Sequence, residues 1–219
     1  MPLFSRDPGS QEDLADLVAT EDVSARVVDA FRRIDRQNFV PDDMGQNPYV
    51  DRPIEILEHQ TTSQPSLIAR MIDAADLQPG DRALEVGTGF GFQTALLVHL
   101  AGSTVSIDRH ASLSAAARQN LDRAGVAGVE LVVGDGWEGW ADGAPYDAII
   151  VSAAAEKVPD AFVDQLVEGG RLVIPVRGPH GDDVLLYIRR NGHLVKIRLL
   201  TPARFVPLVP GEALDQSKE

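Results

Sequence analysis

The sequence predicts an α/β fold with a mostly parallel central sheet flanked by helices. From residue 82 onward, strand-like and helix-like segments alternate, and a glycine-rich turn, "GTGFG" (87–91), follows the first strand-like segment. Such alternation favours parallel strands with helices on both faces. The 219 residues, 44% hydrophobic and 24% charged, are an ordinary balance for one medium-sized globular domain.

The first third of the chain is predicted to be helical, with an irregular start. We expect residues 1–19 to form a loose, acidic lead-in and Thr20 to begin a helix, because a hydroxyl cap is followed there by acidic residues. Helical spacing then relates Val23, Val27, Phe31 and Ile34. Three prolines predict a loop over residues 38–53, and Pro65 suits the first turn of a second helix.

The remaining elements follow from hydrophobic patterning. Buried strands are predicted at 82–86, 104–108, 129–134 and 146–152, and helices at 92–101, 112–125 and 159–170. Three further strands are expected at 171–176, 183–190 and 193–200, the last two as an antiparallel pair.

The chain is expected to be one structural unit with two parts. Residues 1–64 would form an N-terminal helical extension and a loop beside the substrate, packed on a main domain of residues 65–219. The polar ending over residues 209–219 predicts disorder.

Composition argues against several classes of function. A net charge of −13 repels phosphate backbones, so we expect no nucleic-acid partner. No apolar run approaches the roughly 20 residues of a membrane-spanning helix, and the N-terminus is too polar for a secretory signal. Cysteine is absent and the five histidines are dispersed, so no metal site is expected. These features predict a cytoplasmic protein without a membrane partner.

The glycine-rich turn predicts a ligand site at the carboxyl edge of the sheet. Gly87, Gly89 and Gly91 are spaced G-x-G-x-G, and Phe92 occupies the third glycine position of the dinucleotide fingerprint G-x-G-x-x-G. The turn therefore differs from that of nicotinamide-binding folds.

Acidic residues lie at or near the ends of three successive predicted strands: Glu85, Asp108 and Asp135. Each alone is equally compatible with a helix cap or a solvated turn. Together they suit a positively charged nucleoside better than a phosphate, and S-adenosylmethionine, with its sulfonium and amino groups, is such a ligand.

The chain resembles the protein-L-isoaspartate O-methyltransferases, a family of class I S-adenosylmethionine-dependent enzymes. The resemblance runs from Phe39 to Leu208 and includes "QTTSQP", "LEVGTGFGFQTA", "GDGWEGW", "APYDAIIVSAAA" and "RFVPLV". The glycine turn alone indicates a generic methyltransferase, whereas "TTSQP" and "DGWEGWADGAPYDAIIVSAAA" are the specific signals. His59 stands where this family commonly has glycine, and Thr62 where it commonly has isoleucine.

The resemblance implies a Rossmann-like methyltransferase fold with added N-terminal helices and late antiparallel strands. It also implies S-adenosylmethionine as cofactor, the isoaspartyl residues of damaged proteins or peptides as substrates, and a monomer. Ser63 matches the family's active-site serine, with Thr62 and His59 beside the substrate. The implied cofactor residues are Thr61, Thr62, Glu85, Gly87, Thr88, Gly89, Asp108 and Arg109, with Asp135 and Gly136 near the adenine.

The expected reaction moves a methyl group to a peptide carboxylate. A carboxyl group with a pKa near 4 is already an anionic nucleophile at neutral pH, so no general base is required. Alignment and exclusion of water are what the protein must supply, and Thr62 and Ser63 are suitable donors to the carboxylate.

Three alternatives remain open at this stage. One is a related carboxyl methyltransferase that acts on normal aspartate in a dedicated peptide. Another is a nucleobase amino methyltransferase, although "NPY" (47–49) lacks the second proline of D/N-P-P-Y. The third is a regulatory cofactor-binding module without catalysis, which would not require "TTSQP".

Overall fold

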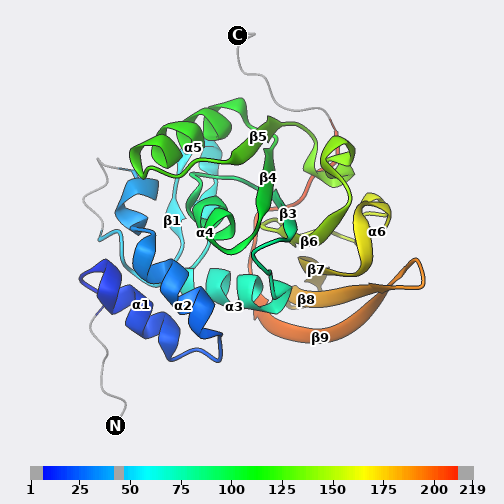
Figure 1. Cartoon of the computed structure of the whole chain (residues 1–219), viewed down its shortest axis with the longest axis horizontal. Coiled ribbons are helices and arrows are strands. Elements are labelled where there is room, and N and C mark those ends of the chain that lie inside the picture. The colour runs from blue at the N-terminus through cyan, green and yellow to red at the C-terminus, as the bar shows by residue number, and fades with distance from the viewer. Residues whose placement is uncertain (1–6, 42–46, 212–219) are drawn as a thin grey trace.

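The computed structural model describes residues 7–41 and 47–211 and is built on a seven-stranded sheet in the order β5-β4-β3-β6-β7-β8-β9 (Figure 1). Strands β5, β4, β3, β6 and β7 run parallel, and β8 and β9 are added antiparallel. This confirms the predicted fold class. The strands are β3 (Arg82–Val86), β4 (Ser103–Asp108), β5 (Val129–Val133), β6 (Tyr146–Val151), β7 (Leu166–Gly178), β8 (Gly181–Arg190) and β9 (His193–Ala203).

Two hydrophobic cores cover the two faces of the sheet. Along β3, Ala83 faces one core while Leu84 and Val86 face the other, because successive side chains of a strand alternate. The first core is completed by residues of α1 (Gln11–Ala19), α2 (Ala25–Arg33), α3 (Pro65–Ala75), α4 (Phe92–Leu100) and α5 (Ala111–Arg123). The second is completed by α6 (Ala161–Gln165), by the short helix η3 (Gly136–Glu138), by Trp140 and Ala144, which flank the short helix η4 (Ala141–Gly143), and by Leu208. In Figure 1, α4 lies to the left of β3 and β4, and α6 lies on the right.

The expected irregular start is wrong, because residues 11–19 form helix α1. Ser10 caps it by accepting a hydrogen bond from the backbone N–H of Asp13, and Leu14, Ala15 and Val18 are buried. Thr20 ends this helix instead of beginning the next one, which starts at Ala25. Burial against α2 and α3 therefore turns a segment that looks acidic and loose into an ordered layer.

The helix expected over residues 159–170 ends much earlier, at Gln165. Leu166 is fully buried and pairs with Tyr146, so the chain enters β7 at once. A bulge separates this pair from the regular register that begins at Arg171, and Gly169 has a φ of +83° within the bulge. Tertiary pairing thus overrides a helix signal made of a proline before the helix and glycines after it.

A small hairpin that we did not predict precedes α3. Strand β1 (Ile54–Glu55) pairs antiparallel with β2 (Thr61–Thr62), and the short helix η2 (Leu57–His59) connects them. The predicted start of α3 at Pro65 is confirmed. Part of the loop expected over 38–53 lies outside the described residues, as do residues 212–219 of the predicted disordered end, whereas 209–211 are described.

Arg36 fastens this hairpin to the rest of the molecule. Its side chain is completely buried after α2, in the short helix η1 (Arg36–Phe39). The guanidinium donates hydrogen bonds to the backbone carbonyls of Pro48, Val50 and Arg52 and to the hydroxyl of Thr62, and it lies over the Phe92 ring. Burial lowers the pKa of Arg36 to about 10, against the opposing influence of the Asp51 charge, so the group stays cationic at neutral pH.

No helix among the described residues is both long and apolar enough to cross a membrane.

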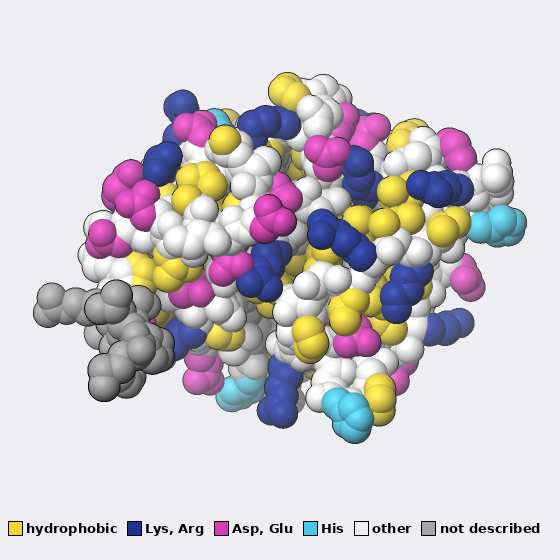
Figure 2. Space-filling model, turned by 90° about the horizontal axis from the view of Figure 1, so that it is seen from below, with side chains coloured by type: hydrophobic (Ala, Val, Ile, Leu, Met, Phe, Trp, Pro, Cys, Tyr) yellow, Lys and Arg dark blue, Asp and Glu magenta, His cyan; other side chains and the backbone are white. Residues whose placement is uncertain are grey.

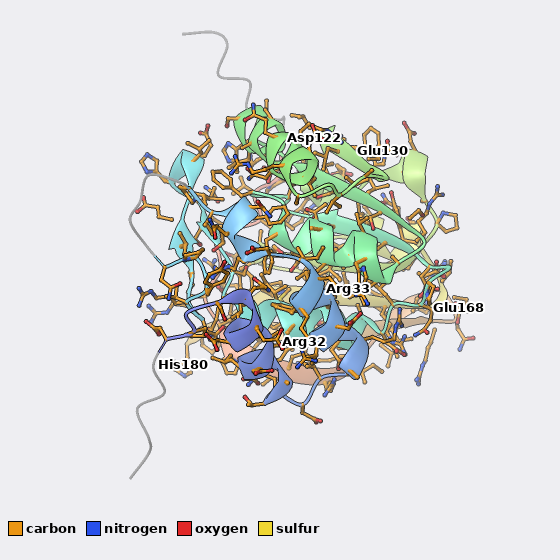
Figure 3. All side chains as sticks on the ribbon, turned by 60° about the vertical axis from the view of Figure 1, so that its left-hand side comes forward. Arg32, Arg33, Asp122, Glu130, Glu168 and His180 are labelled. Carbon is orange, nitrogen blue, oxygen red and sulfur yellow. The ribbon has the colours of Figure 1, made fainter. Side chains whose placement is uncertain are left out.

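Replacing Arg36 by methionine should destabilise the fold strongly. One buried and two partly buried carbonyls lose their donor, and the expected loss is about 3 kcal/mol of unfolding free energy, measured by urea denaturation. Arg33→Met is the control, because Arg33 lies on the surface of α2 in an exposed pair with Asp29 (Figure 3). Equal denaturation midpoints for the two variants would contradict a structural role for Arg36.

Candidate active site

A cavity opens at the carboxyl edge of the sheet, beside the ends of β3, β4 and β6. It encloses about 920 Å³, including its open mouth. Its walls come from the glycine turn, the start of α4, the residues after β4, the β1–β2 hairpin and the segment 206–209. Nine of the predicted site residues line it: Thr61, Thr62, Ser63, Gly87, Thr88, Gly89, Asp108, Arg109 and Gly136.

Glycine is required at two points of the cavity wall, Gly87 and Gly136. Gly87 has a φ of +97°, and a Cβ at this position would lie 3.3 Å from the Cβ of Ser152. At Gly136, across the cavity, a Cβ would approach the Val86 side chain to 2.5 Å. The backbone therefore forms the wall at both points, and a ligand can approach it closely.

Asp108 ends β4 and faces the cavity. Its carboxylate oxygens accept hydrogen bonds from the backbone N–H groups of Gly89 and His110, both at 3.0 Å. Burial raises the pKa of Asp108, and these N–H donors oppose the rise. The carboxylate thus ties the glycine turn to the start of α5 while lining the pocket.

Glu85 lies beneath the cavity lining, not in it. Its side chain is fully buried, and its oxygens accept hydrogen bonds from Gln93, Thr94 and Ser106. Glu85 shares a face of β3 with Ala83, so its side chain points under α4. We predicted Glu85 in the cofactor site; in the structure its side chain lies outside the cavity lining and supports the turn from below.

Two other predicted residues also lie outside the lining. Asp135 accepts hydrogen bonds from the backbone N–H groups of Trp137 and Gly211. Its neighbour Gly136 lines the cavity, whereas Asp135 does not. His59 is exposed, with a φ of +54°. A left-handed backbone favours glycine, which is the common residue here in the methyltransferase family that the sequence resembles. Histidine is one of the residues other than glycine that adopt this conformation more often than most.

Gln93 is a cavity residue that sequence reasoning missed. Its Nε2 donates to both Glu85 and Ser152 at 3.0 Å, which directs the amide oxygen elsewhere. That oxygen is buried and has no hydrogen-bond partner among the described residues, and Gln93 lines the pocket. An unpartnered buried acceptor beside a glycine-rich backbone wall fits a ligand with a positively charged donor, such as the ammonium group of S-adenosylmethionine.

A second cavity adjoins the first. It is bordered by charged side chains, among them Glu21, Asp51, Arg70 and Arg204, and Arg70 is paired with Glu21. The residues that line both cavities form their junction: Thr61, Thr62, Ser63, Ser152 and Val206. Four of these five side chains carry a hydroxyl group.

The junction hydroxyls differ in how they are held. Thr62 Oγ1 accepts hydrogen bonds from Arg36 and from the backbone N–H of Ile54, so its position is fixed. The Ser63 hydroxyl has no hydrogen-bond partner among the residues that the structure describes. The start of α3 is capped instead by Asp51, which accepts from the backbone N–H and the hydroxyl of Ser66. Ser63 is thus not needed as a helix cap.

Several lining residues could not be assigned from the sequence. Segment 206–209 reaches the cavity because β-bridge contacts join Ala154 to Pro207, a contact between distant parts of the chain. Ser152 had a usable signal, since it directly follows a strand end at the ligand-binding edge. Within the described residues, no cluster of histidine and acidic side chains could hold a metal ion.

Comparison with known proteins gives consistent matches over nearly the whole chain. A family model described as protein-L-isoaspartate(D-aspartate) O-methyltransferase matches residues 10–213. Relatives named protein-L-isoaspartate O-methyltransferase from Methanoculleus marisnigri and Methylorubrum populi are 46% and 45% identical. The first match covers 84% of this chain and 83% of the relative, and the second covers 89% and 92%.

Solved structures agree in fold. A protein-L-isoaspartate O-methyltransferase structure superposes with a TM-score of 0.83 at 29% identity, covering 93% of this chain and 67% of that chain. A Plasmodium falciparum structure in complex with S-adenosyl-L-homocysteine has a TM-score of 0.79 at 23% identity, covering 92% of this chain and 99% of its own.

Glu85 should make stability depend on pH. Burial raises its pKa from about 4.5 to about 7, with the hydrogen bonds from Ser106, Thr94 and Gln93 opposing the rise. Between these values the folded chain keeps a proton that the unfolded chain has released, so the contribution of Glu85 to stability falls as pH rises through this window. Glu85→Gln should flatten the wild-type decline by up to about 1.4 kcal/mol per pH unit, measured by urea unfolding at pH 5 to 8.

The matched control is Glu156→Gln, because Glu156 is exposed. Its unfolding free energy should follow the wild-type pH dependence. Parallel pH profiles for Glu85→Gln and wild type would refute the raised pKa.

Proposed function

The chain belongs to the protein-L-isoaspartate(D-aspartate) O-methyltransferase family, and from this membership we propose that it repairs damaged proteins. In this proposal it transfers a methyl group from S-adenosylmethionine to the free carboxylate of L-isoaspartyl residues in proteins or peptides. The observation that carries the proposal is the pair of adjoining cavities with hydroxyl groups at their junction. Transfer between two substrates requires two sites that meet at one point.

The first cavity is the proposed cofactor site. S-adenosylmethionine supplies a methyl group on a positively charged sulfur when bound. The Gln93 amide oxygen would accept a hydrogen bond from its ammonium group, and Asp108 would accept hydrogen bonds from the ribose hydroxyls. Gly87, Thr88, Gly89 and Arg109 would form the surrounding wall, with Gly136 beside the adenine.

The second cavity is the proposed acceptor site. A carboxylate that enters the junction from this side meets Thr61, Thr62 and Ser63 before it reaches the first cavity. The Ser63 hydroxyl can donate to the non-attacking oxygen and leave the other oxygen free to attack the methyl carbon. Arg36 holds Thr62 in place, which keeps this wall of the junction rigid.

Other parts of the proposal concern the whole molecule. We place residues 1–64 as a helical and substrate-site extension of the main domain, and we propose a cytoplasmic monomer that binds neither nucleic acid nor membranes. The face in Figure 2 supports the lack of nucleic-acid binding, because its dark blue basic side chains are interspersed with magenta acidic ones. The net charge of −13 acts in the same direction.

Matched peptides test the substrate. Two peptides that differ only in containing aspartate or isoaspartate at one position are incubated with labelled S-adenosylmethionine, and base-labile methyl esters are counted. We expect label in the isoaspartyl peptide alone. Equal labelling of both peptides would favour the alternative enzyme that methylates normal aspartate.

Ser63→Ala tests the proposed donor. The kcat/KM for the isoaspartyl peptide should fall about 10- to 100-fold, because a hydrogen bond to a charged group is lost. The affinity for S-adenosylhomocysteine, measured by calorimetry, should stay within about twofold, since the cofactor cradle is otherwise intact. Ser103→Ala is the control, because Ser103 is exposed at the amino end of β4, opposite the site. Unchanged turnover in Ser63→Ala would return Ser63 to a structural role.

A further inference from the structure

Ser152 and Ser63 both line the junction, but they come from different parts of the chain. It directly follows β6, whereas Ser63 follows the β1–β2 hairpin. Its backbone N–H donates to the carbonyl of Val86 at 2.8 Å, which holds it against the end of β3. Ser152 is one of the five residues that line both cavities.

The Ser152 hydroxyl is oriented by a buried chain of hydrogen bonds. Glu85 accepts from Gln93 Nε2, and the same nitrogen donates to Ser152 Oγ, both at 3.0 Å. Glu85 is itself held by the hydroxyls of Thr94 and Ser106. When Glu85 is ionised, exchanging the two ends of the amide would place the amide oxygen against a carboxylate. Gln93 thereby presents N–H, not C=O, to Ser152.

This orientation determines what Ser152 can do. An oxygen that accepts a hydrogen bond from an amide still carries its own hydrogen. Among the described residues, no acceptor takes that hydrogen. The Ser152 hydroxyl is therefore a donor without a protein acceptor, at the point where the two cavities meet.

We propose that Ser152 is a second acceptor-binding residue that donates a hydrogen bond to the substrate carboxylate, and that Gln93 is the residue that positions it. The inference rests on the proposed function. One carboxylate oxygen attacks the methyl carbon as the carbon–sulfur bond breaks and its electron pair stays on sulfur. Ser63 and Ser152 approach the carboxylate from two chain segments, so they restrict its rotation about the carbon–carbon bond and keep the attacking oxygen in line.

The change in charge on the acceptor carboxylate predicts whether removal of the Ser152 hydroxyl alters KM or kcat. The carboxylate loses its negative charge as the ester forms, so a donor to it favours the bound substrate at least as much as the transition state. Removal of the Ser152 hydroxyl should therefore act mainly on peptide binding. A role confined to packing would not distinguish a carboxylate from a neutral group in its place.

The test uses Ser152→Ala in the full-length protein, with Ser103→Ala as the control. Alanine fits the half-buried strand end without new contacts, and unchanged thermal unfolding confirms an intact fold. We expect kcat/KM for the isoaspartyl peptide to fall about 10- to 100-fold, chiefly through KM, while the Kd for S-adenosylhomocysteine changes less than about twofold.

A second measurement isolates the carboxylate contact. With S-adenosylhomocysteine bound, calorimetry compares the isoaspartyl peptide with a peptide whose acceptor carboxylate is replaced by its carboxamide. Wild type should prefer the carboxylate, because hydrogen bonds to an ionised acceptor are the stronger ones. Ser152→Ala should lose most of this preference.

Each other outcome overturns the inference. An unchanged kcat/KM, an unchanged carboxylate preference, or an equal loss of peptide and nucleoside affinity would each assign the Ser152 hydroxyl a different role. Failure of the proposed function itself would appear separately, as absence of methyl transfer to the isoaspartyl peptide by the wild-type protein.

Discussion

The buried guanidinium of Arg36 is the interaction on which the acceptor side of the site depends. The loop from Pro48 to Arg52 is partly buried and forms no regular element, so its buried carbonyl groups need donors from elsewhere. A guanidinium supplies several N–H groups in one plane and remains charged when buried. By also reaching Thr62 and lying over Phe92, Arg36 joins the N-terminal helices, the junction and the first residue of α4.

A second buried ionisable side chain organises the proposed cofactor side in a similar manner. Glu85 collects hydrogen bonds from α4 and β4 and, through Gln93, from the end of β6. Three elements that meet under the glycine turn are thus held by a single carboxylate. Arg36 lies over the ring of Phe92, and Glu85 accepts a hydrogen bond from Gln93, so these two neighbouring residues of α4 connect the two halves of the site.

The sequence predicted much of this arrangement because strand ends and glycine turns obey local rules. The strand 82–86 and the cavity residues Gly87, Gly89 and Asp108 follow from hydrophobic patterning and the position of ligands in doubly wound sheets. Glu85 lies outside the cavity lining because it is one residue before the end of β3, where alternation turns its side chain under α4. Asp108 is the last residue of β4 and therefore faces the cavity.

Other features depend on contacts that no local pattern contains. The early end of α6 and the place of segment 206–209 are set by pairing with Tyr146 and Ala154, which are distant in the chain. Gln93 resembles any polar residue in the first turn of a helix until Glu85 and Ser152 are seen beside it. Side-chain orientation within a hydrogen-bond network is a tertiary property, and it is what separates a structural amide from a functional one.

The two cavities have largely different linings and share only five residues. In the proposed function, only the acceptor residue of a damaged protein would have to reach that shared junction. The spent nucleoside and the peptide would then occupy different cavities of the enzyme. The geometry thus suits an enzyme that binds protein or peptide substrates of many shapes and has one fixed donor site.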